Sequence, residues 1–159
     1  MKKILIILLI PMLLCSCGKK ECGKTVGIVN QKETQYTIKA HDIIVNSNQE
    51  ITVEQMNQLK KYEITVNVNN NFDIYEAKYI GVKLTDFLNL YEKEYSILNA
   101  VSRTNKMINY SSRKLPANAY VVFNKDGKEL SQTVIANFDL ATNYWLYDLT
   151  SISFYQGGV

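Results

Sequence analysis

Short runs in which apolar and polar residues alternate constrain the fold of this chain most. Ile64, Val66 and Val68 alternate with Thr65 and Asn67, and a period of two predicts a strand with one buried face. Similar or continuous apolar runs predict strands over 36–40, 43–45, 74–80, 100–103, 107–110, 119–123 and 151–155. The chain is therefore expected to be rich in strands.

Two short helices are expected between these strands. Thr52 and Gln55 form the capping-box pattern ahead of a helix over 53–61. A second helix has apolar residues at helical spacing from Leu84 to Tyr91. The run 69–71 and the pair Asp126-Gly127 are turn signals. So few helices exclude a doubly wound parallel sheet, and the expected fold class is α+β: a strand-rich mixed sheet with two or three short helices.

The first residues have the pattern of an export signal. Two lysines precede an apolar run from Ile4 to Leu14, and Leu14-Cys15-Ser16-Cys17 follows. The ending resembles the lipobox of bacterial lipoproteins, with a hydrophobic residue three places before the cysteine and a small one directly before it. The resemblance implies cleavage before Cys17 and diacylation of its sulfur, so that the protein faces the extracytoplasmic side of a bacterial cell membrane through a lipid anchor.

Two alternatives fit the N-terminal segment less well. A spanning helix needs about 20 apolar residues, whereas this run is shorter and contains Pro11. The ordinary secretory peptidase prefers a small residue at the third-last position, which is bulky here. We therefore expect a signal peptide over 1–16, a lipidated cysteine and flexible tether over 17–33, and a single domain over 34–156.

The charge and cysteine content exclude several classes of partner and chemistry. Lys2 and Lys3 leave with the signal, so the mature chain is nearly neutral and has no basic stripe for nucleic acid. Of three cysteines, Cys15 is removed and Cys17 carries the lipid. Cys22 then has no intramolecular disulfide partner, and its role is left open.

No constellation of catalytic or metal-binding residues is visible. His41 is the only histidine, and neither a triad nor a zinc site can be assembled around it. The residues 67–73 alternate in the manner of a calcium loop, but Phe72 and Lys78 stand where that loop needs Gly and Glu. No glycine-rich phosphate loop occurs. We therefore predict no bound metal and no catalytic residue.

Tyrosine is abundant, and one aromatic cluster is a candidate contact surface. Tyr144, Trp145 and Tyr147 are nearly consecutive, and they cannot all face the core from one strand. The alternative is a core tryptophan flanked by half-buried tyrosines.

Several segments together resemble the sulfite-oxidase-type molybdopterin-binding domain. The segment 79–88 (Tyr-Ile-Gly-Val-Lys-Leu-Thr-Asp-Phe-Leu) is similar to a motif that opens a helix after a strand in that family. Segments 51–59, 119–130 and 145–152 resemble other family segments in the same order. The resemblance covers about residues 50–155 and implies a molybdopterin-domain-like fold.

The departures from the family concern its cofactor. The family binds molybdenum through a cysteine in the loop after the strand that matches 64–68, where this chain has Asn69-Asn70-Asn71. An amide does not replace a soft thiolate ligand. The family's pterin contacts use arginine and histidine, so Arg103, Arg113 and His41 are the candidates for cofactor binding. We expect no molybdopterin and predict no cofactor.

These observations favour a lipid-anchored, non-catalytic module that binds an unknown protein or small-molecule partner, with no nucleic acid. The alternative is a small cell-envelope oxidoreductase that uses a molybdopterin-type or other cofactor. A pocket that brings Arg103, Arg113 and His41 together would favour the enzyme.

Overall fold

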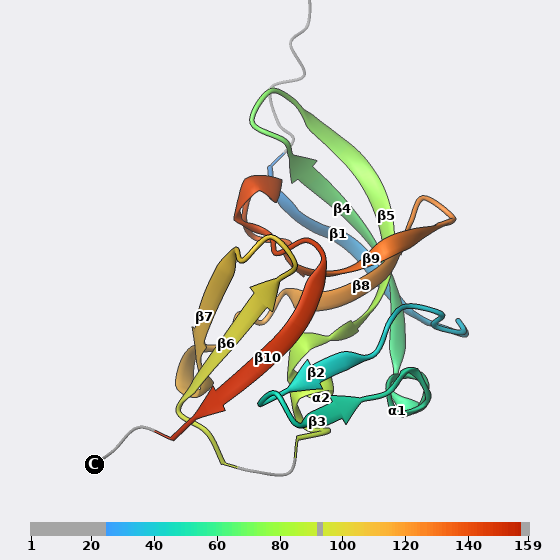
Figure 1. The fold of residues 1–159 in the computed structure, drawn as a ribbon. Helices are drawn as coiled ribbons and strands as arrows, with labels where there is room; N and C mark the ends of the chain where they lie inside the picture. The colour runs from blue at the N-terminus through green and yellow to red at the C-terminus, as the bar shows by residue number, and fades with distance from the viewer. Residues whose placement is uncertain (1–24, 92–93, 157–159) are drawn as a thin grey trace, which may run out of the picture.

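A computed structural model describes residues 25–91 and 94–156 and contains many strands (Figure 1). The strands are β1 Gly27–Thr34, β2 Ile43–Val45, β3 Gln49–Ile51, β4 Lys61–Asn69, β5 Ile74–Lys83, β6 Ile97–Ser102, β7 Met107–Ser111, β8 Ala119–Lys125, β9 Lys128–Asn137 and β10 Leu149–Tyr155. The helical elements are all short: α1 Val53–Gln58, α2 Leu84–Leu88, and the 3-10 turns η1 Ser112–Lys114 and η2 Thr142–Tyr144.

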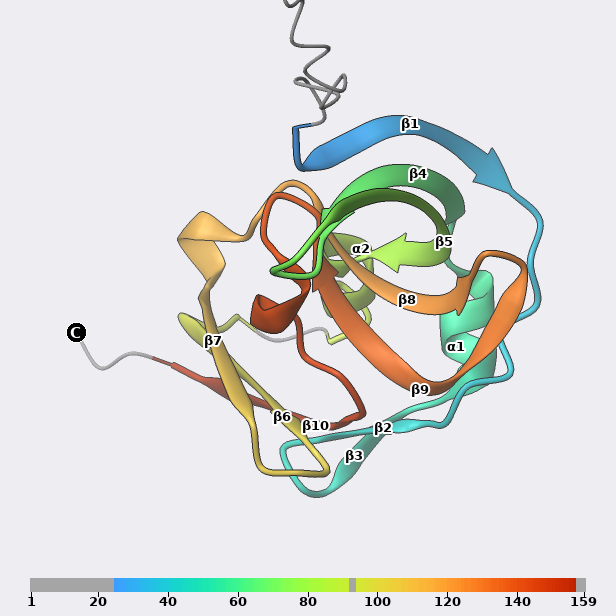
Figure 2. The same cartoon turned by 90° about the horizontal axis from the view of Figure 1, so that it is seen from above.

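The first sheet has the order β1-β4-β5-β8-β9, and every pairing in it is antiparallel. Seen from above, this sheet curls strongly (Figure 2). The Tyr120 hydroxyl on β8 donates a hydrogen bond to Gln31 Oε1 on β1 at 2.8 Å, although two strands separate β1 from β8. A flat sheet could not bring these two strands within reach of one another, so the curl creates a concave face.

The second sheet has the order β3-β2-β10-β6-β7. Its β2–β10 pair is parallel and its other pairs are antiparallel, so this sheet is mixed. Parallel neighbours need a long crossover, and here nearly the whole domain lies between β2 and β10 in sequence.

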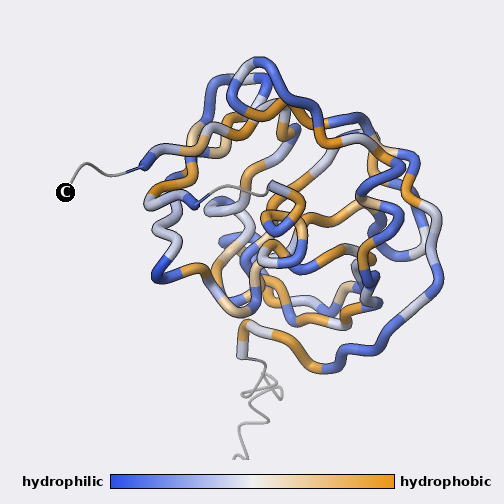
Figure 3. Tube along the Cα trace, turned by 90° about the horizontal axis from the view of Figure 1, so that it is seen from below, coloured by the Kyte–Doolittle hydropathy of each residue, from blue (hydrophilic) through white to orange (hydrophobic). Residues whose placement is uncertain are grey.

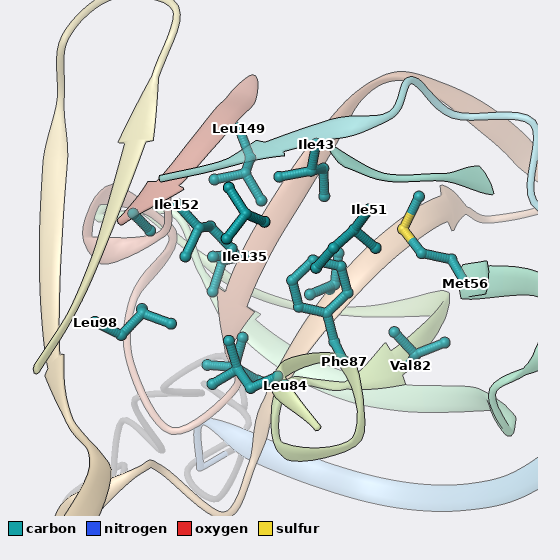
Figure 4. Close-up of a cluster of buried hydrophobic side chains, with 14 of the residues drawn as sticks. Ile43, Ile51, Met56, Val82, Leu84, Phe87, Leu98, Ile135, Leu149 and Ile152 are labelled. Carbon is teal, nitrogen blue, oxygen red and sulfur yellow. The ribbon is translucent and has the colours of Figure 1, made fainter. Parts of the chain in front are cut away.

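Buried side chains form two cores on opposite faces of the curled sheet. One core lies between the two sheets, where Ile43, Ile135 and Ile152 point toward Phe87 of α2 (Figure 4). The other fills the concave face and includes Phe138 and Trp145. The trace coloured by hydropathy shows apolar stretches recurring along the inner strands and polar stretches along the outer loops (Figure 3). Strand β8 is buried on both faces because it contributes to both cores.

The structure confirms a strand-rich chain with only short helices, but its strands form two sheets instead of one. The capping box at Thr52 and Gln55 is formed as predicted. Asp126 and Gly127 form the β8–β9 turn and both have positive φ, as a two-residue hairpin turn of the I′ type requires. The helices are shorter than expected: α1 ends at Gln58 and α2 at Leu88.

Two expectations for the N-terminal part of the domain were wrong. The tether predicted over 17–33 is structured from Gly27 onward, because β1 pairs along β4. The strand predicted over 36–40 is absent, although Ile38 is buried. There the Asn57 side chain accepts from the Ile38 N–H at 2.7 Å and donates to the Ile38 carbonyl at 3.0 Å, and so replaces a strand partner.

Candidate functional site

The concave face of the curled sheet holds an aromatic pocket with a volume of about 160 Å³. Its rings come from Tyr75 and Tyr79 on β5 and from Trp145 and Tyr147 after η2. Apolar side chains of β8 and β9 complete the walls, and the polar contributions come from Lys125, Ser131, Gln132 and Thr142. We call this cavity the aromatic pocket. Such a combination of rings with a few polar groups is typical of small-molecule sites.

Trp145 is the rigid element of the aromatic pocket. It is 1% exposed, and its Nε1 donates to the Asn137 carbonyl at 2.9 Å and to the Leu140 carbonyl at 3.2 Å. Its ring packs edge-on against Tyr79 and Phe138, with centroid separations of 5.6 and 5.4 Å. The ring is therefore held in one orientation and presents a preformed wall.

Lys125 reaches the aromatic pocket because β8 is bulged. In the β5–β8 pair, Ile80 pairs with Asn124 and Gly81 with Val122, so Phe123 is the extra residue of β8. In a regular strand, residues three apart face opposite sides, whereas Val122 and Lys125 both line this pocket. A bulge commonly redirects a side chain in this way. Lys125 Nζ then lies 3.3 Å from the Tyr75 hydroxyl, and 5.1 and 5.8 Å from the ring centroids of Tyr75 and Tyr79.

Burial raises the pKa of two tyrosine hydroxyls in the aromatic pocket, those of Tyr79 and Tyr147. Burial, with smaller contributions from Tyr75, Tyr147 and Asp126, raises the pKa of Tyr79 well above its usual value. Burial also raises the pKa of Tyr147, against the opposing effect of a hydrogen bond with Thr142. Both phenols therefore stay protonated and can donate hydrogen bonds to a ligand.

The three aromatic residues predicted as a contact surface are divided between core and surface. Trp145 is buried, whereas Tyr144 is 60% exposed and Tyr147 is 45% exposed. Tyr147 lines the aromatic pocket together with Trp145, and Tyr144 is not among its lining residues. The arrangement is that of a core tryptophan between two partly exposed tyrosines.

A second, polar pocket of about 210 Å³ brings together two of the three candidates for cofactor binding. His41 and Arg103 both line it, whereas Arg113 lies exposed in η1 and does not. Arg103 Nε lies 3.0 Å from Asp148 Oδ2, and the Arg103 N–H donates to the Asp148 carbonyl at 2.9 Å.

Two of the three acidic residues that line this polar pocket, Asp42 and Asp148, have structural partners. Asp42 Oδ1 accepts from the Val53 N–H at 2.7 Å at the start of α1, and Asp148 is paired with Arg103. Thr133 Oγ1 is buried and has no hydrogen-bond partner among the described residues. No group of three or more His, Cys, Asp or Glu side chains within the described ranges could hold a metal ion.

Sequence reasoning missed Tyr75, Tyr79 and Lys125 as one site. Lys125 belongs to an Asn-Lys-Asp-Gly segment whose sequence predicts a turn. No residue in that segment predicts a β-bulge. The predicted lipidation site Cys17, together with Cys22, lies outside the described residues. In the described part of the chain, no helix has the length and apolar character to cross a membrane.

Comparison of the chain with protein-family models and with curated protein sequences finds no match.

Proposed function

We propose that this protein is a lipid-anchored, extracytoplasmic module that binds a small molecule in its aromatic pocket without catalysis. The aromatic pocket carries the proposal, since it combines a preformed Trp145 wall with a few polar groups. The membrane part rests on the lipobox-like segment that ends at Cys17.

A substitution at the mouth of the aromatic pocket tests ligand binding. Trp145 is the only tryptophan, so its fluorescence reports on the site directly. We would screen the purified full-length protein in mild detergent against a library of small anionic, neutral and cationic ring compounds. For any compound that shifts the emission, Tyr147→Ala should weaken binding about tenfold because one aromatic wall is lost.

The control for this screen is Tyr144→Ala. Tyr144 is close to Tyr147 in sequence and also exposed, but it does not line the aromatic pocket. Its removal should leave affinity unchanged. An equal loss of affinity in both variants would contradict binding in this pocket. So would a screen in which no compound of any charge shifts the fluorescence emission.

The lipid anchor has a separate test. Cys17→Ala removes the acylated sulfur and should move the protein out of the membrane fraction, because two acyl chains are needed for stable anchoring. Cys22→Ala is the matched control and should leave membrane fractionation unchanged. Membrane retention of Cys17→Ala would refute the anchor.

We further infer that the domain is a degenerate relative of the sulfite-oxidase-type molybdopterin-binding fold. The relationship is supported by β5, which runs through Gly81 directly into α2. We call the relative degenerate because the β4–β5 turn carries Asn69, Asn70 and Asn71 where the family has its cysteine.

The alternative is a small cell-envelope oxidoreductase. Its support is the polar pocket that His41 shares with Arg103, and the separate position of Arg113 counts against it. Elemental analysis and pterin fluorescence of the purified protein decide between the two functions. Molybdenum or pterin in a one-to-one ratio would favour the enzyme and overturn the non-catalytic module.

A further inference from the structure

The charge of Lys125 is uncompensated within the aromatic pocket. No Asp or Glu is found among its described lining residues, and no carboxylate of the described chain lies within 4.0 Å of Lys125 Nζ. Asp126 follows in sequence, but its carboxylate accepts from the Lys78 N–H at 2.8 Å. The pocket is therefore positively charged at one point.

The ammonium group has hydrogen-bonding capacity to spare. It carries three N–H donors, and the Tyr75 hydroxyl at 3.3 Å is its acceptor among the described residues. The side chain is half-buried, so its remaining donors have less access to water than those of a surface lysine. An anionic partner would stabilise this partly desolvated ammonium group through a charge-assisted hydrogen bond.

The rings around Lys125 argue against a cationic ligand. Aromatic cages bind ligand cations through the faces of their rings, but here Tyr75 and Tyr79 already face the protein's own ammonium. A cationic ligand at these rings would be repelled by the ammonium group of Lys125. The neutral hydroxyl of Tyr79 and the amide of Gln132 offer further donors to an anion.

The size and walls of the aromatic pocket limit the rest of the ligand. An apolar cavity of about 150 Å³ accommodates a benzene-sized molecule, and the volume here is about 160 Å³. The ring centroids of Trp145 and Tyr147 are 6.3 Å apart, and the two ring planes form an angle of 26°. These flat surfaces favour a ligand with a flat apolar ring.

We propose that the aromatic pocket selects small monoanions with one flat apolar ring, such as aromatic carboxylates, and that Lys125 Nζ receives the anionic group while the ring lies against Trp145 and Tyr147. This assignment rests on the proposed function of the pocket as a ligand site. No covalent step is involved.

Three ring compounds of similar size test the charge preference on the full-length protein in mild detergent. Phenylacetate, phenylacetamide and phenethylamine share the ring and differ in charge. Binding is followed by Trp145 fluorescence with excitation at 295 nm. Phenylacetate should bind at least about tenfold more tightly than phenylacetamide, as expected for a hydrogen bond to a charged group, and phenethylamine should bind most weakly.

The Lys125→Met variant keeps the length and apolar stem of the side chain and removes the charge. It should bind phenylacetate and phenylacetamide equally, whereas Lys125→Arg should keep the preference for the carboxylate. Lys128→Met is the matched control, because Lys128 pairs with Lys125 across the same hairpin but is exposed and outside the aromatic pocket. It should bind as the wild type does.

The outcomes separate this inference from the proposed function. If phenylacetamide or phenethylamine binds as well as phenylacetate, the pocket is a ligand site and the anion preference is wrong. Persistence of the preference in Lys125→Met also overturns the inference. If none of the three probes binds, the inference fails, and the wider screen with Tyr147→Ala then decides whether the pocket binds ligands at all.

Discussion

At the scale of single residues, Asn57 links α1 to a segment that has no strand partner. Its amide accepts from the Ile38 N–H and donates to the Ile38 carbonyl, and Ile38 is 1% exposed. Backbone groups at buried positions must be hydrogen-bonded. One side chain therefore satisfies both backbone groups of a core residue.

We predict that Asn57→Ala lowers the free energy of unfolding by about 1–3 kcal/mol, since it leaves the backbone groups of Ile38 unpaired. Urea unfolding measures this loss. Gln58→Ala is the control, because Gln58 is exposed and adjacent and its truncation should change stability by less than about 0.5 kcal/mol. Equal stability of the two variants would show that water can form the hydrogen bonds to Ile38 that the Asn57 amide makes.

Tyr120 gives the stability a pH dependence on the alkaline side. Burial is the main cause that raises its pKa to about 12, aided by Tyr62 and Asp86 and opposed by the hydrogen bond with Gln31. The ordinary tyrosine pKa is about 10. Above that pH the unfolded chain loses the phenol proton while the folded chain keeps it, so stability falls with rising pH.

We predict that the free energy of unfolding decreases between pH 10 and pH 12, and that this decrease is smaller in Tyr120→Phe. Burial raises the pKa of Tyr110 to about 12 as well, so Tyr110→Phe should reduce the decrease in the same direction. Denaturant unfolding at several pH values checks both. An identical pH dependence in wild type and both variants would contradict the assignment.

At the scale of elements, irregularities in the strands position the candidate site. The bulge at Phe123 in β8 directs Lys125 to the concave face. This bulge shifts the register of the β5–β8 pair between Ile80 and Gly81. A Cβ at Gly81 would lie 2.5 Å from the Val121 carbonyl oxygen and 2.9 Å from Val122 Cγ1, so only glycine allows this close approach.

We predict that Gly81→Ala destabilises the protein by about 1–3 kcal/mol, as expected for overpacking against backbone. Gly127→Ala is the comparison. It has open space around its Cβ but a positive φ, so its cost of roughly 1 kcal/mol should come from backbone strain alone. Thermal or urea unfolding measures both. If Gly81→Ala were as stable as the wild type, β5 and β8 could move apart to accommodate the Cβ without a loss of stability.

At the scale of the whole molecule, the curled sheet joins the two cores. Strand β8 places Tyr120 and Val122 in the concave core, and Val121 and Phe123 in the core between the sheets. Neither core can lose its packing without disturbing this shared strand.

We predict a single cooperative unfolding transition. Trp145 fluorescence reports on the concave core, and far-UV circular dichroism reports on all strands, so the two urea curves should coincide. A fluorescence change at lower urea would show that the concave core, and the aromatic pocket with it, opens independently.

The sequence by itself determined the local elements whose signals lie within a few residues. Alternation predicted β4, the capping box predicted the start of α1, and Asp126-Gly127 predicted the β8–β9 turn. These features depend on side-chain direction and backbone conformation along one stretch of chain, so they are readable without knowledge of neighbours.

Only the tertiary structure decided how the strands divide into two sheets, that Gly27–Thr34 is a strand, and that Tyr75, Tyr79, Lys125 and Trp145 line one pocket. Strand pairing joins residues that are distant in sequence, and the curl and bulges arise from that pairing. The aromatic pocket follows from these long-range contacts, which is why the Tyr144–Tyr147 segment alone could not indicate which of its rings would face a ligand.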